Sequence, residues 1–300
     1  MSTQGRTRLK AIAAMTTAVA AFSGLDATLK LFSQHYPPMQ VAVLRGLASL
    51  PFMLLPVLAL GRLADLKPRR FGMHLLRGAL SVAVLGGFIY AVRVLSLANA
   101  YSIFLAAPLI VTALSVPLLG DRVDWRTWLA ISIGLIGVLT MLRPSASALV
   151  TLGALAALLS ATAYSFSAIA LRVLTRTDTT ASVVFWTLGL MTVFAGVIAA
   201  PQWVPLQRAH LKWLVAMGAF GSIGQLLFTE AFRSAPPSIV APFEYTALLW
   251  GVAIDWAMWD VLPAGRIYLG GSIVIASGLY LIWRERLGST AVAASGAAAP

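Results

Sequence analysis

Two acidic residues within one apolar stretch are the first candidates for chemistry. Residues 236–260, PPSIVAPFEYTALLWGVAIDWAMWD, carry Glu244 and Asp255 in a run long enough to cross a membrane. In a continuous helix, residues three turns apart return to nearly the same azimuth, so these two acids share a face with Leu248 and Gly251. A carboxylate that faces lipid costs about 3 kcal/mol or more. We therefore predict that this face lines a solute pathway.

A second set of charges lies on the first two apolar runs. Asp26 and Lys30 stand one helical turn apart, in the order that favours an intrahelical ion pair, so we predict that they are partners. Arg45 lies about 10 Å into the second run, close to the depth of Asp26. Two interpretations stay open. Either the three charges form a structural network, or Arg45 grips a carboxylate of a zwitterion while Asp26 receives its ammonium group.

Four aromatic residues complete the predicted substrate-binding set. Tyr90 and Tyr101 flank the turn between the third and fourth runs, where each is either a substrate contact or an interfacial aromatic. Tyr245 directly follows Glu244 and is grouped with it. Trp250 lies well inside its run, so stacking on a ligand competes with ordinary core packing as its role.

Prolines in two runs are expected to interrupt their helices. Pro108 and Pro242 each remove a backbone donor near mid-membrane, which either frees carbonyl groups for a substrate ammonium or simply kinks the helix. Any proton coupling would fall to the acids inside the runs, namely Asp26, Glu244 and Asp255.

Other kinds of chemistry find no support in the sequence. It contains no Gly-rich phosphate loop with a Walker lysine, which argues against ATP hydrolysis, and it contains no cysteine. His35, His74 and His210 lie at the ends of runs, a pattern that does not indicate a metal site. We therefore expect a protein that is not an enzyme and that needs neither a cofactor nor a metal.

The composition indicates a polytopic membrane protein. Of the 300 residues, 59% are hydrophobic and 11% are charged, whereas about a quarter of residues are charged in soluble domains. Short loops separate ten apolar runs, at residues 10–32, 39–61, 73–95, 98–119, 127–142, 149–171, 181–200, 211–232, 237–259 and 265–283. The predicted fold class is all-α with ten transmembrane helices, followed by a disordered small-residue tail at 287–300.

The basic residues predict the orientation. Most loop Arg and Lys residues fall on the side of the N-terminus, among them Arg69, Arg77 and Arg176, whereas Arg143 and Arg208 are among the few on the other side. This asymmetry places both termini in the cytoplasm of a bacterial inner membrane. It also explains the pI near 10.9 without a nucleic-acid partner.

The two halves of the chain resemble each other weakly. The segment FSGLDATLK at 22–30 aligns with YSFSAIALR at 164–172, and RTWLAISI at 126–133 aligns with RIYLGGSI at 266–273. Both alignments have an offset of about 140 residues. We predict two five-helix repeats, 1–145 and 146–286, of inverted orientation because an odd number of crossings separates them.

Several segments resemble a known family. They are APPSIVAPFEYTALLW at 235–250 and GLYLIWRE at 278–285, together with Arg45, APL at 107–109 and LGD at 119–121. They resemble the ten-helix EamA-type members of the drug/metabolite transporter superfamily, and the chain is similar to bacterial amino-acid exporters, including the aromatic-amino-acid type. The resemblance implies a transporter fold for nearly the whole chain.

We therefore expect a secondary transporter that exports small organic solutes, most simply amino acids, by alternating access through a central cavity. A metabolite or drug transporter of the same fold, in either direction, is the alternative; a membrane-embedded enzyme or a scaffold protein would belong to a different class. The expected partners are a small-molecule substrate and membrane lipids. The chain would act as a monomer or a homodimer.

Overall fold

The computed structural model describes residues 3–119, 125–141, 148–234, 241–262 and 265–296, and these residues form helices joined by short loops. The first half contains six α-helices and one 3-10 helix: α1 (Thr3–Ser33), α2 (Pro38–Ala59), η1 (Leu63–Leu66), α3 (Phe71–Val94), α4 (Leu97–Phe104), α5 (Ala107–Leu119) and α6 (Trp125–Met141). The second half contains α7 (Ala148–Leu174), α8 (Thr180–Ala199), η2 (Ala200–Gln202), η3 (Arg208–His210), α9 (Leu211–Ser234), η4 (Ala241–Tyr245), α11 (Thr246–Trp259) and α12 (Gly265–Gly296).

Six of these helices are long and apolar enough to cross a membrane. They contain the segments Lys10–Ser33, Pro38–Ala59, Phe71–Val94, Leu152–Leu171, Thr180–Gln202 and Arg208–Ala231. Shorter apolar helices cover Leu97–Val111, Trp128–Gly137 and Ile267–Tyr280. The all-helical membrane class is confirmed, and the count of ten spans stays a prediction.

Two of the predicted spans are interrupted, as their prolines led us to expect. In the fourth span, α4 ends at Phe104 and α5 begins at Ala107, one residue before Pro108. In the ninth span, Pro242 lies in the 3-10 helix η4, and α-helical geometry begins only at Thr246. Proline removes a hydrogen bond and its ring disfavours a helical conformation in the residue before it, so both interruptions have a local cause.

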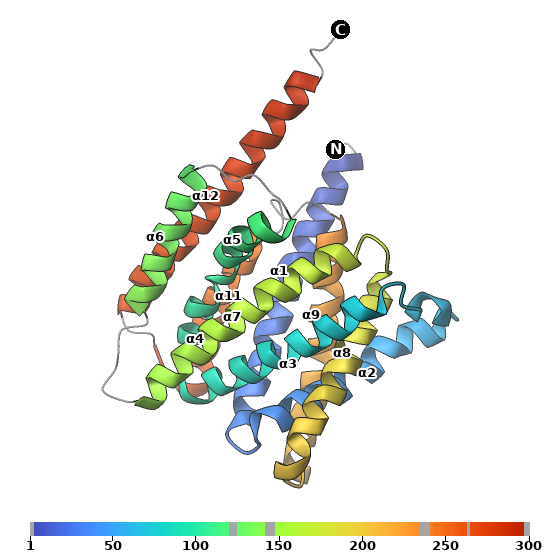
Figure 1. Cartoon of the computed structure of the whole chain (residues 1–300). Helices are drawn as coiled ribbons and strands as arrows, with labels where there is room; N and C mark the ends of the chain where they lie inside the picture. The colour runs from blue at the N-terminus through green and yellow to red at the C-terminus, as the bar shows by residue number, and fades with distance from the viewer. Residues whose placement is uncertain (1–2, 120–124, 142–147, 235–240, 263–264, 297–300) are drawn as a thin grey trace.

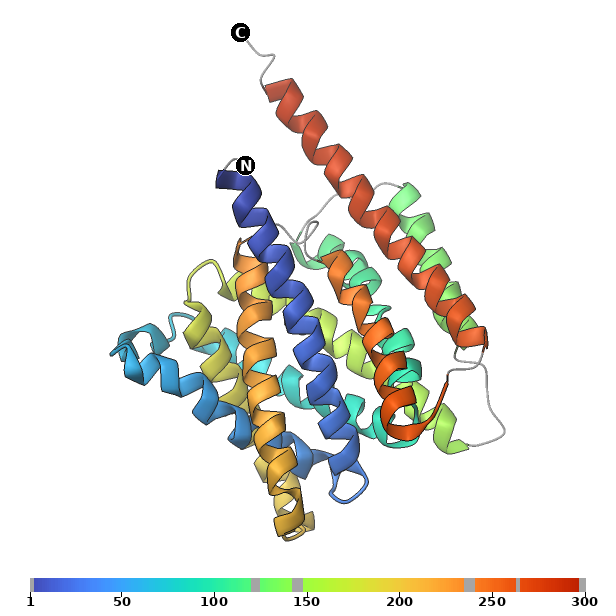
Figure 2. The same cartoon turned by 180° about the vertical axis from the view of Figure 1, so that it is seen from behind.

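Helices from the two halves interleave. α1 packs against α9, α3 against α7, α2 against α8, and α6 against α12, and Figures 1 and 2 show the α6–α12 pair at one flank of the bundle. Backbones approach closely where glycines face a partner helix; a Cβ at Gly218 of α9 would collide with the carbonyl of Ala48 on α2. The start of α1 and the end of α12 lie at the same end of the molecule, which we call the terminal end.

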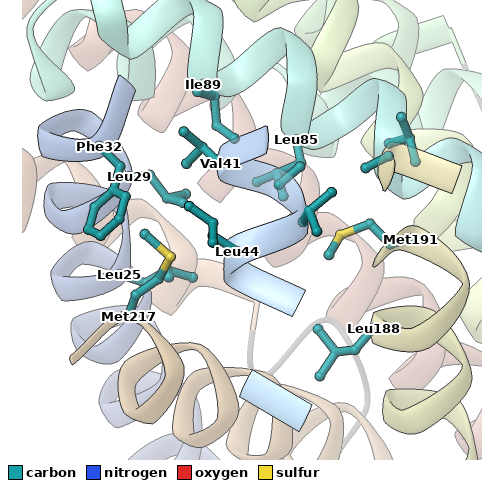
Figure 3. Packing of buried hydrophobic residues seen from close by; sticks show 14 of the residues in the cluster. Leu25, Leu29, Phe32, Val41, Leu44, Leu85, Ile89, Leu188, Met191 and Met217 are labelled. Carbon is teal, nitrogen blue, oxygen red and sulfur yellow. The ribbon is translucent and has the colours of Figure 1, made fainter. Parts of the chain in front are cut away.

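The largest apolar core lies where α1, α2, α3, α8 and α9 meet. Figure 3 shows this cluster, whose labelled members include Leu29 of α1, Val41 of α2, Ile89 of α3 and Met217 of α9, all fully buried. Residues of both halves contribute, so the two halves share this core. Each buried aliphatic side chain contributes roughly 1.5–3 kcal/mol in a soluble protein, whereas in lipid the gain comes from close packing.

The end of the chain differs from the expectation. α12 continues to Gly296, although we predicted a disordered tail from Leu287, and 297–300 lie outside the described residues. The tail is rich in alanine, which has the highest helix propensity, and it extends a helix that is already formed. Extension needs no new nucleation, so the α-helical conformation continues.

Two hydrogen-bonded clusters join the loops of the two halves, one at each end of the bundle. The Tyr36 cluster lies at the end opposite the termini, which we call the far end. Tyr36 Oη accepts the Gln207 N–H at 3.0 Å and lies 2.8 Å from Nδ1 of His210. Beside it, Gln40 donates to the Val204 carbonyl and accepts the Val204 N–H.

The Asp178 cluster lies at the terminal end. Asp178 Oδ1 accepts the Arg69 N–H at 2.8 Å and lies 3.0 Å from Nε2 of the fully buried His74. Ser182 donates to the carbonyl of Leu66. Asp178 follows Tyr36 by about 140 residues, the offset of the sequence repeat, and Ser182 follows Gln40 by the same interval. The two clusters therefore occupy corresponding positions in the two halves.

The Asp178 carboxylate has a lowered pKa. Burial by itself would raise this pKa, but hydrogen bonds from His74, Thr177 and the Arg69 amide, together with the His74 charge, lower it below the ordinary aspartate value. Thr177 Oγ1 donates to the second carboxylate oxygen at 2.6 Å. The folded protein therefore favours the ionised form of Asp178.

Candidate functional site

The centre of the candidate site is the contact between Asp26 and Tyr101. The Tyr101 hydroxyl donates to Asp26 Oδ2 at 2.7 Å, which joins α1 to α4. Asp26 lies about 10 Å along α1 from the far end of that helix. Tyr101 is buried and stacks on Phe88, with ring centroids 6.0 Å apart. α11 leaves room for the Tyr101 ring because it has Gly251 there, where a Cβ would collide with the ring.

Arg45 lies near this carboxylate without binding it. It interacts electrostatically with Asp26, yet among the described residues Arg45 forms no direct ion pair. Its Nη1 lies 3.7 Å from the Met191 sulfur, a weak acceptor, and its Nε is buried with no hydrogen-bond partner. Asp26 and Arg45 are both half-buried. An acid and a guanidinium group thus lie close together, each with capacity for another partner.

Lys30 does not pair with Asp26, so our prediction of an intrahelical pair is wrong. Its ammonium instead contacts Asp255 Oδ1 of α11 at 2.8 Å and lies over the Trp259 ring at 4.1 Å from the centroid. The second Asp255 oxygen accepts the Ala98 N–H at 2.8 Å. Asp255 is fully buried and requires a counter-ion, whereas Asp26 already has the Tyr101 hydroxyl. The Lys30–Asp255 pair therefore joins α1 to α11.

The helix between Glu244 and Asp255 is not uniform, although the predicted shared face assumed a continuous α-helix. Glu244 lies in η4, which has a 3-10 conformation, and α11 begins two residues later at Thr246. A 3-10 helix turns about 120° per residue instead of 100°, so each 3-10 step after Glu244 shifts its azimuth relative to Asp255 by about 20°. Glu244 is half-buried and interacts electrostatically with Tyr164 of α7, whereas Asp255 contacts Lys30 of α1 and Ala98 of α4.

The other predicted aromatics lie apart from Asp26. Tyr245 is buried against Gly278 of α12, and its hydroxyl has no hydrogen-bond partner in the described part of the chain. Trp250 is 41% exposed on α11, and Tyr90 is half-buried near the end of α3, with no hydrogen bond or ring contact to another described residue. Of the predicted set, the structure brings together Asp26, Arg45 and Tyr101.

The sequence analysis missed three residues that carry or contact charges inside the bundle. Arg77 was counted among loop charges, but it is only 6% exposed, six residues into α3. Tyr164 of α7 and Trp259 of α11 were placed in no site. Arg77 could have been found from the sequence because it is a charge inside an apolar run. Tyr164 and Trp259 could not, because the residues that they contact lie far away in the sequence.

Helices long enough to span a membrane, packed around charged side chains at mid-bundle, define a membrane transport protein. The model of the EamA-like transporter family matches residues 9–143 and again residues 151–284. The chain belongs to this family.

Characterised relatives carry different solutes. A riboflavin transporter of Vibrio cholerae is 26% identical over 268 residues, covering 88% of this chain and 89% of the relative. A pseudopaline exporter of Pseudomonas aeruginosa PAO1 is 26% identical over 85% of this chain and 90% of its own length. An S-adenosylmethionine uptake transporter of Rickettsia conorii is 22% identical over 94% and 95%. The relatives thus include both an exporter and an uptake protein.

A solved crystal structure of a protein superposes on this chain with a TM-score of 0.65 and 18% identity, covering 92% of this chain and 98% of the other. This likeness supports the fold alone. The relatives are not specifically aromatic-amino-acid exporters, so that finer part of the resemblance is not shown.

Proposed function

We propose that this protein is a secondary transporter for a small organic metabolite that carries both an anionic and a cationic group. The observation that carries the proposal is the arrangement of Asp26 and Arg45. Arg45 has an unpartnered Nε and no direct ion pair among the described residues, and Asp26 keeps accessible surface beside it. A solute carboxylate would bind the guanidinium group in two-pronged fashion, and its ammonium would bind Asp26.

Tyr101 and the Lys30–Asp255 pair have supporting roles in this proposal. The Tyr101 hydroxyl holds the Asp26 carboxylate in one orientation at 2.7 Å. The Lys30–Asp255 pair is saturated by Trp259 and the Ala98 amide, which leaves it little capacity for a solute. We therefore assign the pair to the framework and Asp26 with Arg45 to the solute. Glu244 remains a proposed proton-coupling residue.

The substrate class rests on the charges alone. Amino acids are the simplest zwitterions of this kind, but no relative named above is an amino-acid exporter. Riboflavin and S-adenosylmethionine, named for relatives, form the second group to be tested. The direction of transport is left to the experiment because the relatives include both an exporter and an uptake protein.

We infer that the two halves are inverted repeats that alternate access to the two sides of a bacterial inner membrane. Support comes from the two family matches, from the reciprocal packing of α1 on α9 and α3 on α7, and from the corresponding Tyr36 and Asp178 clusters. In this proposal the terminal end is cytoplasmic. Reporters fused after Arg70 and Arg176 should be cytoplasmic and one within 143–148 external; a cytoplasmic signal there would contradict the ten-span arrangement.

Transport is tested with the purified chain in proteoliposomes. Labelled phenylalanine, tryptophan, riboflavin and S-adenosylmethionine are followed in both directions, with and without a proton gradient. For the solute that is carried, Arg45→Lys keeps the charge but loses the planar fork, so we expect about tenfold weaker apparent affinity. The matched control is Arg62→Lys, in an exposed pair with Asp65. If Arg45→Lys keeps full transport at low substrate concentration, the carboxylate grip is wrong.

A further inference from the structure

A second guanidinium group is buried in the bundle and forms no ion pair with any residue that the structure describes. Arg77 is 6% exposed on α3, and its Nε and Nη1 are buried with no hydrogen-bond partner among the described residues. It lies about 9 Å from the start of α3, at the terminal end, whereas Asp26 lies about 10 Å from the far end. The two sites therefore lie at different depths along the bundle.

Tyr164 connects Arg77 to an acid, Glu244, so that groups of the same kinds as in the first site lie near one another. Tyr164 of α7 interacts electrostatically with both Arg77 and Glu244. Its ring packs on Phe104, with centroids 5.2 Å apart, at the point where α4 ends. An acid, a tyrosine and an arginine thus occur together here, as Asp26, Tyr101 and Arg45 do nearer the far end.

The two acid–tyrosine pairs lie on matching elements of the two halves. Asp26 lies on the first helix of its half and Tyr101 on the fourth span; Tyr164 and Glu244 occupy the matching elements of the second half with acid and tyrosine exchanged. In the alignment of 22–30 with 164–172, Tyr164 matches Phe22, one helical turn before Asp26, so the acid and the tyrosine lie on matching helices but not at matching positions. Each half therefore supplies one acid–tyrosine pair from its first helix and its fourth span.

We propose that Arg77, Tyr164 and Glu244 form a second solute station near the terminal end, where Arg77 binds an oxyanion, a carboxylate or phosphate, of the transported molecule. This inference rests on the proposed function, because it assigns the second station to the same pathway. The solute would pass from Arg45 to Arg77 as access changes sides. Tyr164 would donate to the bound oxyanion, and Glu244 would receive the cationic part.

The unpartnered guanidinium gives the proposal its discriminating test. A buried charge without a partner is unfavourable, so Arg77→Gln should leave the ligand-free protein as thermally stable as wild type, or more so. An arginine needed for the framework would instead make the variant less stable. Arg77→Lys keeps the charge and tests the need for the planar fork.

Binding is measured by thermal unfolding of the full chain in a detergent without phosphate groups, titrated with acetate or inorganic phosphate against chloride at equal ionic strength. In wild type and in Arg45→Gln we expect stabilisation by the oxyanion. In Arg77→Gln the remaining apparent affinity should be at least about tenfold weaker than in Arg45→Gln, since hydrogen bonds to a charged group are lost. The double variant should show no response.

Three outcomes would overturn the second station. They are a destabilised ligand-free Arg77→Gln, an unchanged response of Arg77→Gln when Arg45→Gln abolishes binding, and an Arg77-dependent response to added phosphatidylglycerol with none to acetate or phosphate. The second outcome leaves the Asp26–Arg45 site intact. Failure of both Arg45→Gln and Arg77→Gln to alter any response would count against the proposed function itself.

Discussion

The Lys30 ammonium on α1 bonds the Asp255 carboxylate on α11 at 2.8 Å, although Asp26 lies one turn away on the same helix. Each acid has a different partner: Asp26 accepts a hydrogen bond from the Tyr101 hydroxyl, and Asp255 pairs with the Lys30 ammonium. The charge inside the bundle is thus divided between a saturated pair and an acid with capacity for a ligand.

Lys30→Met should destabilise the protein by about 3–5 kcal/mol because it leaves the fully buried Asp255 carboxylate without its cation. Adding Asp255→Asn should recover much of this loss, because the amide oxygen still accepts the Ala98 N–H. Thermal unfolding in detergent measures both. Lys67→Met, on an exposed loop, is the control and should change stability little. If the double variant lost as much stability as Lys30→Met and Asp255→Asn lose together, the two residues would not be coupled.

Tyr101→Phe should weaken solute binding while the fold is kept. Loss of the hydroxyl frees Asp26 to rotate, and one hydrogen bond to a charged group corresponds to roughly a tenfold or greater loss of apparent affinity. The ring still stacks on Phe88, so unfolding temperature should fall only slightly. Tyr268→Phe, on the exposed side of α12, is the matched control. Wild-type affinity in Tyr101→Phe would remove Tyr101 from the site.

The Asp178 cluster should make stability depend on acid pH. The folded protein lowers the pKa of Asp178 below the unfolded value of about 3.9, so its stabilisation is complete above that value and is lost as pH falls through the folded pKa. Asp178→Asn should cost about 1–3 kcal/mol at pH 6, and its difference from wild type should shrink toward pH 3. Unfolding temperatures across this range measure it.

The control for that series is Asp65→Asn, which removes a carboxylate paired with exposed Arg62 and leaves the Asp178 contacts in place. It should keep the wild-type dependence on pH. A constant gap between wild type and Asp178→Asn from pH 6 to pH 3 would contradict the lowered pKa.

Gly278→Ala should destabilise the packing of α12 on η4. A Cβ at this position would collide with the Tyr245 hydroxyl, and overpacking of this kind costs about 1–3 kcal/mol. Gly189→Ala on α8 is the matched control, since nothing lies within 4 Å of its added Cβ. That variant should be neutral or stabilised by up to about 1 kcal/mol through helix propensity. Similar losses in both variants would argue against the close contact.

Local patterns in the sequence predicted the elements well. The apolar runs coincide with the helices, and Pro108 and Pro242 marked the two interruptions, because helix length and proline effects are properties of neighbouring residues. The depths of Asp26 and Arg45 along their helices could also be derived from helix geometry.

The partners of the charges could not be predicted in this way. Lys30 and Asp255 are 225 residues apart, and their contact depends on how α1 and α11 pack. A one-turn pair contributes only about 0.2–0.5 kcal/mol, so tertiary packing easily overrides it. The change to 3-10 geometry in η4, which shifts the azimuth of Glu244, also could not be derived from a regular helical period.

In the Tyr36 cluster and the Asp178 cluster, side chains of one half bind backbone groups of the other half. Asp178 accepts the amide of Arg69, Tyr36 accepts that of Gln207, and Gln40 bonds both backbone groups of Val204. A backbone amide is common to nineteen of the twenty amino acids, with proline as the exception. In a saturation mutagenesis experiment, positions 69, 204 and 207 should thus tolerate most substitutions but reject proline, and the loops that carry them are free to diverge in sequence while the clusters persist.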